Sequence, residues 1–381
     1  MRQKNKLASV SAMIAVAVLA LTGCSEGGTG GGPVASGERT AAAQEALDRA
    51  FEGVGSDLAD LPPVTAKPGV NFYSVSCGES VPSCATNTAA MVEAAEAVGW
   101  TASIADGKLS PEGFATATRQ AIAGGANVIS PVGIGCAVAQ AAFQEAKDAG
   151  ITVVGGGSVD DCDPKLWASE RLWLEDSTPM SQWQSFGAQQ ADYAYGMTNG
   201  DVKAIALNFT TQAWGPWITE GFENQLGTLG GGEVVDTIDI SDPEVADGSF
   251  IQKVTTAILS HPEANTLIVP VDGWLSNGLA SALVSAGVDE QLLVIGRGGD
   301  APVLDLIRQG GSGVDATVGF AYAWGAWGSV DTAMRVLAGQ EPVYIGEPAQ
   351  VIDAEHNMPA SGAYEGDVDY KAAFKAAWGV K

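Results

Sequence analysis

The segment from residue 261 to residue 273 reads HPEANTLIVPVDG. Its uncharged run from Thr266 to Pro270 is short and apolar, which is typical of a strand buried on both faces of a parallel sheet. A helical pattern over residues 247–260 precedes the run, and another over residues 275–286 follows it. Strand and helix alternate in this way in βαβ units, so the segment predicts a parallel sheet covered by helices.

The same alternation extends in both directions and falls into two series of about equal length. The first series has expected strands at 70–76, 100–105, 126–131 and 151–155, with helices at 86–98, 111–123 and 136–149. The second has expected strands at 202–209, 233–240, 266–270 and 292–295, with helices at 180–197, 214–229, 247–260 and 275–286. The sequence therefore predicts an α/β protein of two Rossmann-like lobes, each a parallel sheet flanked by helices. Ligands of open α/β sheets bind beyond the carboxyl ends of the strands, so two facing lobes would share one cleft.

The composition argues against a nucleic-acid partner and against disorder. The 381 residues include 19 Lys or Arg and 45 Asp or Glu, which gives a formal net charge of −26. Binding to a phosphate backbone depends on clustered cations, and the chain has no basic run beyond its N-terminus. Hydrophobic residues at 46% and charged residues at 17% are typical of a chain that buries a large core.

The N-terminus has the features of an export signal. Cations within residues 1–6 precede an apolar run over residues 7–21, which is too short for a membrane span of about 20 residues. The sequence Leu-Thr-Gly-Cys at residues 21–24 resembles the lipobox of bacterial lipoproteins, in which the cysteine is lipidated and becomes the new N-terminus. We expect residues 1–23 to be a lipoprotein signal peptide and Cys24 to anchor the protein at the extracytoplasmic face of the cell membrane. A plain signal peptide with an incidental cysteine is the alternative.

Residues 24–65 are expected to form a tether and an N-terminal helical extension. Six glycines lie between Ser25 and Gly37, which is typical of a flexible linker. A helical pattern over residues 38–60 then ends before Pro62. We expect this extension to pack on the body of the protein or to be loosely attached.

Four cysteines remain once Cys24 is assigned to lipid, namely Cys77, Cys84, Cys136 and Cys162. An even number in an exported protein favours disulfides. Cys77 and Cys84 flank a short loop, so their mutual pairing is the simplest connectivity and leaves Cys136 with Cys162, although sequence alone allows three pairings. A zinc site is the alternative, but the chain lacks Cys-x-x-Cys spacing and has two histidines. No metal or cofactor is expected.

Several stretches resemble ribose-type periplasmic binding proteins. Residues 261–273 are similar to the place where a helix ends in His-Pro, an apolar strand follows, and an Asn-Asp pair meets ligand. Residues 219–222 resemble the Gly-Phe helix motif of that family, and residues 292–296 resemble the strand of its Val-Gly-Phe-Asp motif. The similarity covers residues 68–356 or so, and it identifies the chain as resembling the type 1 (LacI-like) solute-binding proteins of bacterial ABC importers.

This resemblance implies a two-lobed protein with a three-segment hinge that closes on a small molecule. The interdomain crossings are expected near residues 172–178, 317–323 and 346–352. Residues 66–174 with 321–348 are then the N-terminal lobe, and residues 175–320 with 349–381 are the C-terminal lobe. The implied partners are a small-molecule ligand, the transmembrane subunits of an ABC permease and the membrane through the lipid, with the protein itself a monomer.

The chain departs from the family pattern where sugar-binding members hold hydroxyl groups. Those members use an Asp-Arg pair after the fourth strand and an Asp in the Val-Gly-Phe-Asp motif. Here the corresponding residues are Gly-Gly-Gly-Ser at 155–158 and Gly-Arg-Gly-Gly-Asp at 296–300, and Val271 stands where the family usually has Asn. A pentose or hexose held in the usual way is therefore not expected, unless a carboxylate at 160, 161 or 300 turns into the cleft.

Aromatic side chains are the expected replacement for those polar groups. Rings stack on aromatic ligands or on the apolar faces of sugars, whereas the alternative for any one ring is packing in the core. The candidates at strand ends and in first helical turns are Phe209, Trp214, Trp217, Trp274, Phe320, Tyr322 and Trp324.

Five polar residues are the further ligand-binding candidates. Glu79 and Ser80 lie in the Cys77–Cys84 loop, which follows the first strand and would cover the cleft. Asp272 and Arg297 follow strands, and Asn208 lies near the end of the strand at residues 202–209. The alternative for Glu79 and Ser80 is an ordinary surface loop, and the alternative for Asp272 is a loop-capping role. For Arg297 it is a salt bridge, and for Asn208 it is hydrogen bonding to the backbone alone.

An enzyme is disfavoured because the chain has neither a Gly-x-Ser-x-Gly elbow nor a phosphate-cradling Gly-x-x-x-x-Gly-Lys motif. Of its two histidines, His261 precedes a proline at a helix end and His356 lies near the third expected crossing. A ligand-binding subunit for a membrane sensor or chemoreceptor is the other alternative, and sequence does not separate it from an importer subunit.

Overall fold

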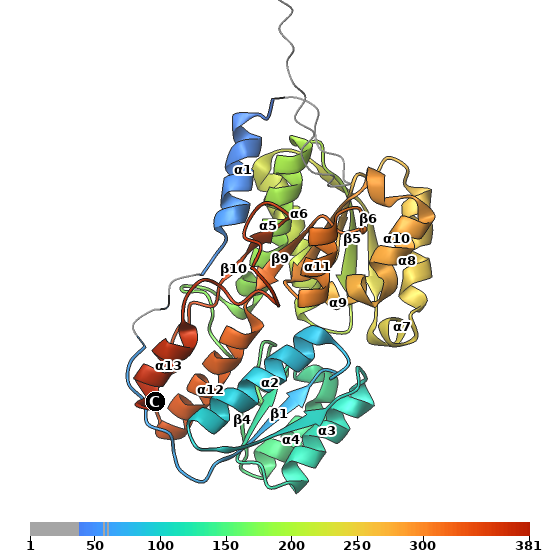
Figure 1. The fold of residues 1–381 in the computed structure, drawn as a ribbon. Coiled ribbons are helices and arrows are strands. Elements are labelled where there is room, and N and C mark those ends of the chain that lie inside the picture. Colours follow the sequence, from blue (N-terminus) through green and yellow to red (C-terminus); the bar gives the residue numbers. More distant parts are fainter. Residues whose placement is uncertain (1–37, 56–57, 59–60) are drawn as a thin grey trace, which may run out of the picture.

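The computed structural model describes residues 38–55, 58 and 61–381. The expected signal peptide, Cys24 and most of the tether lie outside these described residues. The described chain forms two lobes, each a sheet dominated by parallel pairing and flanked by helices (Figure 1). The predicted fold class is therefore confirmed.

The N-terminal lobe, in the lower part of Figure 1, is built on four parallel strands in the order β2-β1-β3-β4. Its strands are β1 (Asn71–Ser76), β2 (Thr101–Asp106), β3 (Val128–Pro131) and β4 (Thr152–Val153). Its helices are α2 (Pro82–Ala97), α3 (Pro111–Ala123), the short η1 (Ala137–Ala139) and α4 (Gln140–Asp148). Helix α2 begins four residues before the expected position because Pro82 supplies a first-turn φ that suits a helix.

The C-terminal lobe has six strands in the order β10-β9-β8-β7-β5-β6, all parallel to their neighbours except β10, which pairs antiparallel with β9. The strands are β5 (Lys203–Phe209), β6 (Glu233–Ile240), β7 (Thr266–Ile268), β8 (Leu293–Gly298), β9 (Ala316–Phe320) and β10 (Ala349–Ile352). The helices are α5 (Pro179–Thr198), α6 (Trp214–Leu229), α7 (Asp242–Asp247), α8 (Ser249–Ser260), α9 (Asp272–Trp274), η2 (Leu275–Leu279), α10 (Ala280–Ala286), η3 (Asp289–Gln291) and α11 (Ala301–Gln309). The expected helix over 247–260 is shortened because Gly248, at φ 77°, separates α7 from α8.

Helices α5 and α6 approach each other unusually closely on one face of the larger sheet. A Cβ on Gly187 would lie 1.9 Å from the carbonyl oxygen of Ile218, and one on Gly221 would lie 2.1 Å from that of Gln184. Two glycines therefore let the helix backbones touch, and this contact fixes the first turns of both helices beside the cleft.

Three chain segments cross between the lobes. The first runs from β4 to α5, the second lies between β9 and α12 (Tyr322–Ala338), and the third joins α12 to β10. Helix α12 packs on α2 of the N-terminal lobe, so the chain enters that lobe at the second crossing and leaves it at the third. The crossings expected near residues 172–178, 317–323 and 346–352 correspond to the segments at residues 154–178, 321 and 339–348 in the structure.

The C-terminal helix α13 (Tyr370–Trp378) corrects the expected lobe boundaries. It packs on α12, where the Trp378 ring stacks on Trp327 and the Trp378 Nε1–H donates to Asp331 at 2.8 Å. The expectation that all of residues 349–381 belong to the C-terminal lobe is wrong for this helix (Figure 1). An amphipathic helix at a chain end carries no local signal for which lobe it will cover.

The N-terminal extension packs on the body, as one of the two expected alternatives. Helix α1 (Ala41–Glu52) lies along α5, and Val54 pairs with Ala349 through two backbone hydrogen bonds of 2.7 and 2.9 Å. Further along, the Pro62 carbonyl accepts a bond from Arg335 on α12 at 2.7 Å. The extension therefore holds both lobes and adds a connection to the three crossings.

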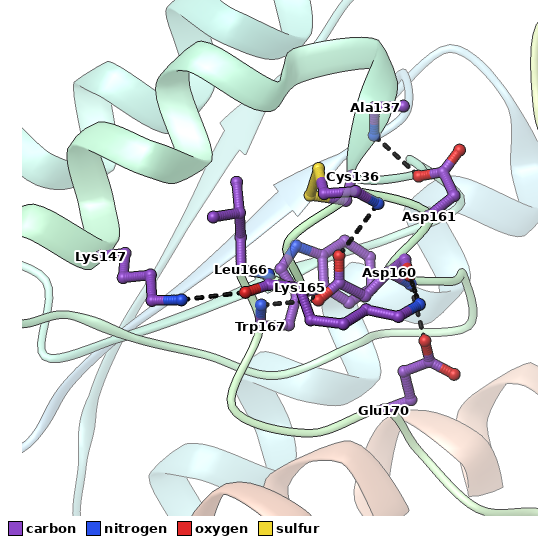
Figure 2. Close-up of a disulfide and its surroundings, with 10 residues drawn as sticks. Cys136, Ala137, Lys147, Asp160, Asp161, Lys165, Leu166, Trp167 and Glu170 are labelled. Atoms are coloured by element: carbon purple, nitrogen blue, oxygen red, sulfur yellow. Dashed lines mark hydrogen bonds between the residues drawn. A yellow bond between two sulfur atoms is a disulfide. The ribbon is translucent and has the colours of Figure 1, made fainter.

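Both disulfides form with the simplest connectivity. Cys77 pairs with Cys84 and Cys136 with Cys162, at Cα–Cα distances of 5.8 and 5.4 Å. In Figure 2 the Asp160 carboxylate beside the second disulfide accepts the backbone N–H groups of Leu166 and Trp167. It also accepts the N–H of Cys162 at 3.3 Å. The sulfurs are bonded to each other, so the zinc alternative does not hold for this arrangement.

Among the described residues, no helix has both the length and the apolar character that a membrane span requires.

Candidate ligand-binding site

A cavity of about 90 Å³ lies between the two lobes. The Cys77–Cys84 loop and the start of α2 line it from the N-terminal lobe, and the loops that follow β5, β6 and β7 line it from the C-terminal lobe together with Arg297 of β8. The lobes also touch directly, because the Gly135 N–H donates to the Gln212 side-chain oxygen at 2.9 Å. The cavity is therefore the closed form of the cleft predicted at the carboxyl ends of the strands.

Four aromatic rings form one continuous wall of this cavity. Trp214 stacks on Trp183 with a centroid distance of 4.7 Å and an interplanar angle of 17°. Phe209 meets Trp214 edge to face, and it meets Trp274 edge to face as well, at 5.3 Å in both pairs. All four residues line the cavity. Three of them were predicted from strand ends, but Trp183 was missed because it opens a helix that follows a crossing and no strand.

Arg297 lies in strand β8, with its guanidinium behind that aromatic wall. Its Nε–H donates to the Pro270 carbonyl at 2.7 Å, and its guanidinium carbon lies 5.3 Å from the ring centroids of both Trp183 and Trp214. The side chain is buried, and its Nη1 has no hydrogen-bond partner among the described residues. Cation–π contacts and a backbone anchor thus hold a charged donor in one orientation at the cavity.

Four buried polar atoms of cavity-lining residues have no hydrogen-bond partner among the described residues. They are the donors Trp214 Nε1 and Arg297 Nη1 and the acceptors Asn87 Oδ1 and Asp242 Oδ2. Burial raises the pKa of Asp242 to about 6. A buried polar group without a partner costs about 1–3 kcal/mol, so this set favours a ligand that both donates and accepts hydrogen bonds.

Asp272 lies beneath the cavity and holds the backbone of the neighbouring loop. Its carboxylate accepts the N–H of Gly299 at 2.7 Å and the Thr317 hydroxyl at 2.8 Å. Burial raises the pKa of this carboxyl. A Cβ on Gly296 would lie 2.2 Å from Asp272 Oδ1, which explains a glycine there. Asp272 does not line the cavity, so it acts on the site by holding the loop directly after β8, the strand that carries Arg297.

The disulfide loop covers the cavity as expected, but through residues other than those predicted. Cys77, Val81 and Cys84 line the cavity. Glu79 instead accepts a bond from the Thr88 hydroxyl at 2.9 Å, and Ser80 is exposed. In a turn closed by a disulfide, neighbouring side chains point in different directions. The sequence does not indicate which of them face the cavity.

Three other predicted residues do not line the cavity. Asn208 donates from its amide to Asp239 at 2.7 Å on the neighbouring strand. Trp217 packs half-buried against the core. Trp324 is fully buried in the N-terminal lobe, where its Nε1–H donates to the Ile345 carbonyl at 2.8 Å. The predicted residues that line the cavity are Phe209, Trp214, Trp274, Arg297, Phe320 and Tyr322.

The carboxylates at 160, 161 and 300 do not replace the missing polar clamp. Asp160 is bonded to its own loop, and Asp161 accepts the Ala137 N–H at 2.7 Å. Asp300 is buried beside Asp272, and both burial and that neighbour raise its pKa. None of the three lines the cavity. Asp242 is the carboxylate that does, and no motif predicted it because it follows the edge strand β6.

Comparison with protein families places the chain by sequence. The model of the family described as "periplasmic binding protein domain" matches residues 85–341, which is about two thirds of the chain. No curated protein sequence matches the chain.

Solved structures share its fold at low sequence identity. One is a galactofuranose binding protein, with a TM-score of 0.62 and 16% identity over 82% of this chain and 99% of that one. Another is a glucose-galactose binding protein from Geobacillus stearothermophilus, with a TM-score of 0.64 and 17% identity over 77% and 100%. A third is a 5-methylthioribose transporter solute binding protein from Thermotoga lettingae, with a TM-score of 0.63 and 17% identity over 81% and 99%.

Proposed function

The chain belongs to the periplasmic binding protein domain family, and we propose that it is the substrate-binding lipoprotein of an ABC importer. Its two lobes close on a small neutral solute with several hydroxyl groups, such as a sugar or a polyol, and the closed form delivers the solute to a membrane permease. The protein itself carries out no catalytic step. Its lipid anchor is Cys24, which keeps it at the extracytoplasmic face of the cell membrane.

The four unpartnered polar atoms are the observation that carries this proposal. Trp214 and Arg297 offer donors, while Asn87 and Asp242 offer acceptors, and they come from both lobes. A hydroxyl group donates and accepts at once, so a polyhydroxylated ligand satisfies both kinds of atom. The aromatic wall suits the apolar face of a sugar ring. The sugars in the names of the three similar structures support the same class.

The size of the cavity narrows the range of solutes that the closed form can hold. About 90 Å³ is far below the ~300–1,000 Å³ of pockets for drug-sized ligands, so the closed form favours a small solute. The hydroxyl clamp of sugar-binding relatives is absent. The solute is therefore held by Arg297, Asp242 and the rings in an arrangement of its own.

A thermal-shift screen followed by calorimetry tests the ligand class. The panel holds pentoses, hexoses, linear polyols and aromatic acids, and we expect at least one sugar or polyol to stabilise the protein. A ligand at 100 times its Kd adds about 2.7 kcal/mol to folding stability, which raises Tm by several degrees. Stabilisation by aromatic acids alone would contradict the proposal and favour an aromatic solute.

The anchor is tested by Cys24→Ala in the full-length protein. We expect the variant to move from the membrane fraction to the soluble extracytoplasmic fraction, because the thiol that receives the lipid is gone. Mass spectrometry of the membrane-extracted parent should find lipid on Cys24. An unmodified cysteine in the parent, or a variant that stays with the membrane, contradicts lipid anchoring.

A further inference from the structure

The first and third crossings meet at one buried ion pair. Arg171 lies on the first crossing and Glu347 on the third, and Arg171 Nη2 lies 2.9 Å from Glu347 Oε2. Their side chains are 1% and 0% exposed. Two residues 176 positions apart thus place opposite charges in the middle of the hinge, away from solvent.

The second crossing packs around the same pair. The guanidinium carbon of Arg171 lies 5.8 Å from the ring centroid of Phe320, the last residue of β9. Its Nη1 lies 3.4 Å from the hydroxyl of Ser329 on α12. Gly325, also on α12, leaves room for Glu347, because a Cβ there would lie 2.2 Å from Glu347 Oε1. All three crossings therefore contact the pair.

Stability alone does not account for this ion pair. Replacing a buried pair with apolar residues is often neutral or stabilising, because taking two charges out of water offsets their attraction. Here the cost of removing the charges from water is large, because the 2.9 Å ion-pair contact is not accompanied by a hydrogen bond. Arg171 Nε and Nη2 and both Glu347 carboxylate oxygens have no hydrogen-bond partner among the described residues. What the pair does impose is geometry, because any movement that separates the first crossing from the third leaves two buried charges unpaired.

We propose that Arg171 and Glu347 are the positioning residues of the hinge, which hold the first and third crossings together as one unit and so restrict the lobes to a narrow closing path. The relevance of that path to ligand capture rests on the proposed function. The restriction itself is a property of the chain, and it is present without ligand.

A second buried ion pair provides a matched control. Arg335 Nε lies 2.7 Å from Asp331 Oδ2, and these side chains are also 1% and 0% exposed. Both residues lie on α12, one turn apart, so this pair spans no crossing. Replacing Arg335 also removes its bond to Pro62, but the Val64 N–H still donates to the Ala377 carbonyl at 3.1 Å and keeps the extension on this lobe. Removing both charges of either pair avoids an unpaired buried charge, and the two neutral double variants are Arg171→Met with Glu347→Gln and Arg335→Met with Asp331→Asn.

The test measures the distance between the lobes in the ligand-free protein. Spin labels are attached at two exposed positions, Gln120→Cys on α3 and Thr256→Cys on α8, in the parent and in both double variants. We expect both double variants to keep a Tm near that of the parent. The distance distribution should broaden toward longer values in the hinge variant only.

A hinge variant with the parent's distribution would overturn the proposal, and so would equal broadening in the α12 control. If the hinge double variant does not fold, Arg171→Lys keeps the charge but loses the planar fork, and it should broaden the distribution as well. Because no ligand is added, a failure of sugar or polyol binding bears on the proposed function and leaves this measurement valid.

Discussion

Trp214→Ala is expected to abolish ligand binding, whereas Trp217→Ala, one turn further along α6, is expected to leave the affinity within about twofold. Trp214 lines the cavity, stacks on Trp183 and lies against the Arg297 guanidinium. Its removal therefore takes away a wall, the support of a second ring and one face of the Arg297 site. Trp217 is an equally large ring that packs outside the cavity.

A loss of stability has to be separated from a loss of binding in this experiment. Truncating a buried Trp costs about 3–5 kcal/mol of folding stability, so unfolding must be measured beside calorimetry for both variants. Trp214→Phe keeps a ring and removes the unpartnered Nε1 donor. We expect it to fold like the parent and to bind several-fold more weakly, since a net hydrogen bond contributes about 0.5–1.5 kcal/mol. Unchanged affinity in Trp214→Ala would contradict the site.

Lowering the pH from about 8 to about 5 is expected to stabilise the folded protein, because burial raises the pKa of several carboxyl groups. The pKa of Asp242 and of Asp315 is raised to about 6. Each group has a folded-state pKa above its unfolded value, so the folded state binds more protons in this window. Their contribution is complete below the unfolded pKa near 4 and is lost as the pH rises through the folded pKa.

The measurement is the free energy of unfolding from urea titrations between pH 4 and pH 8.5. Asp315→Asn should flatten part of the curve, and because one pKa unit corresponds to about 1.4 kcal/mol its share is on the order of 3 kcal/mol. Its side-chain oxygen still accepts the Val294 N–H that Asp315 accepts at 2.8 Å. Glu145→Gln, in an exposed pair with Arg119, is the control. It should leave the slope unchanged above about pH 5.5, because the Arg119 side chain lowers the pKa of the Glu145 carboxyl. A stability that rises steadily with pH would show that these carboxyls titrate normally.

The lobes and most of their strands could be predicted from sequence, because the strands of a parallel sheet buried on both faces are short apolar runs that can be recognised in the sequence itself. Apolar runs at regular spacing predicted β5 and β6 almost to the residue. Strands β9 and β10 had no such regular spacing, since they lie at the second and third crossings. The lobe that α13 covers is set by contacts with residues such as Trp327 and Asp331, and these are far from it in sequence.

The site could be predicted only in part, for a similar reason. Strand ends located Phe209, Trp214, Trp274 and Arg297, because the carboxyl ends of parallel strands meet at one edge. Whether such a residue then faces the cavity or the core depends on the neighbouring element. Asp272 shows this difference, since it follows a strand as predicted but turns toward the loop beneath the site.

The extension that holds both lobes sets a limit on how far they can part. Val54 is bonded to Ala349 on one lobe, and the Val64 N–H donates to the Ala377 carbonyl on the other. Ten residue steps separate these two anchors, and an extended chain spans at most ~3.6 Å per residue, or about 36 Å in all. Along this edge the extension sets a maximum distance between the two lobes. Any wider opening must first break the hydrogen bonds at one of the two anchors.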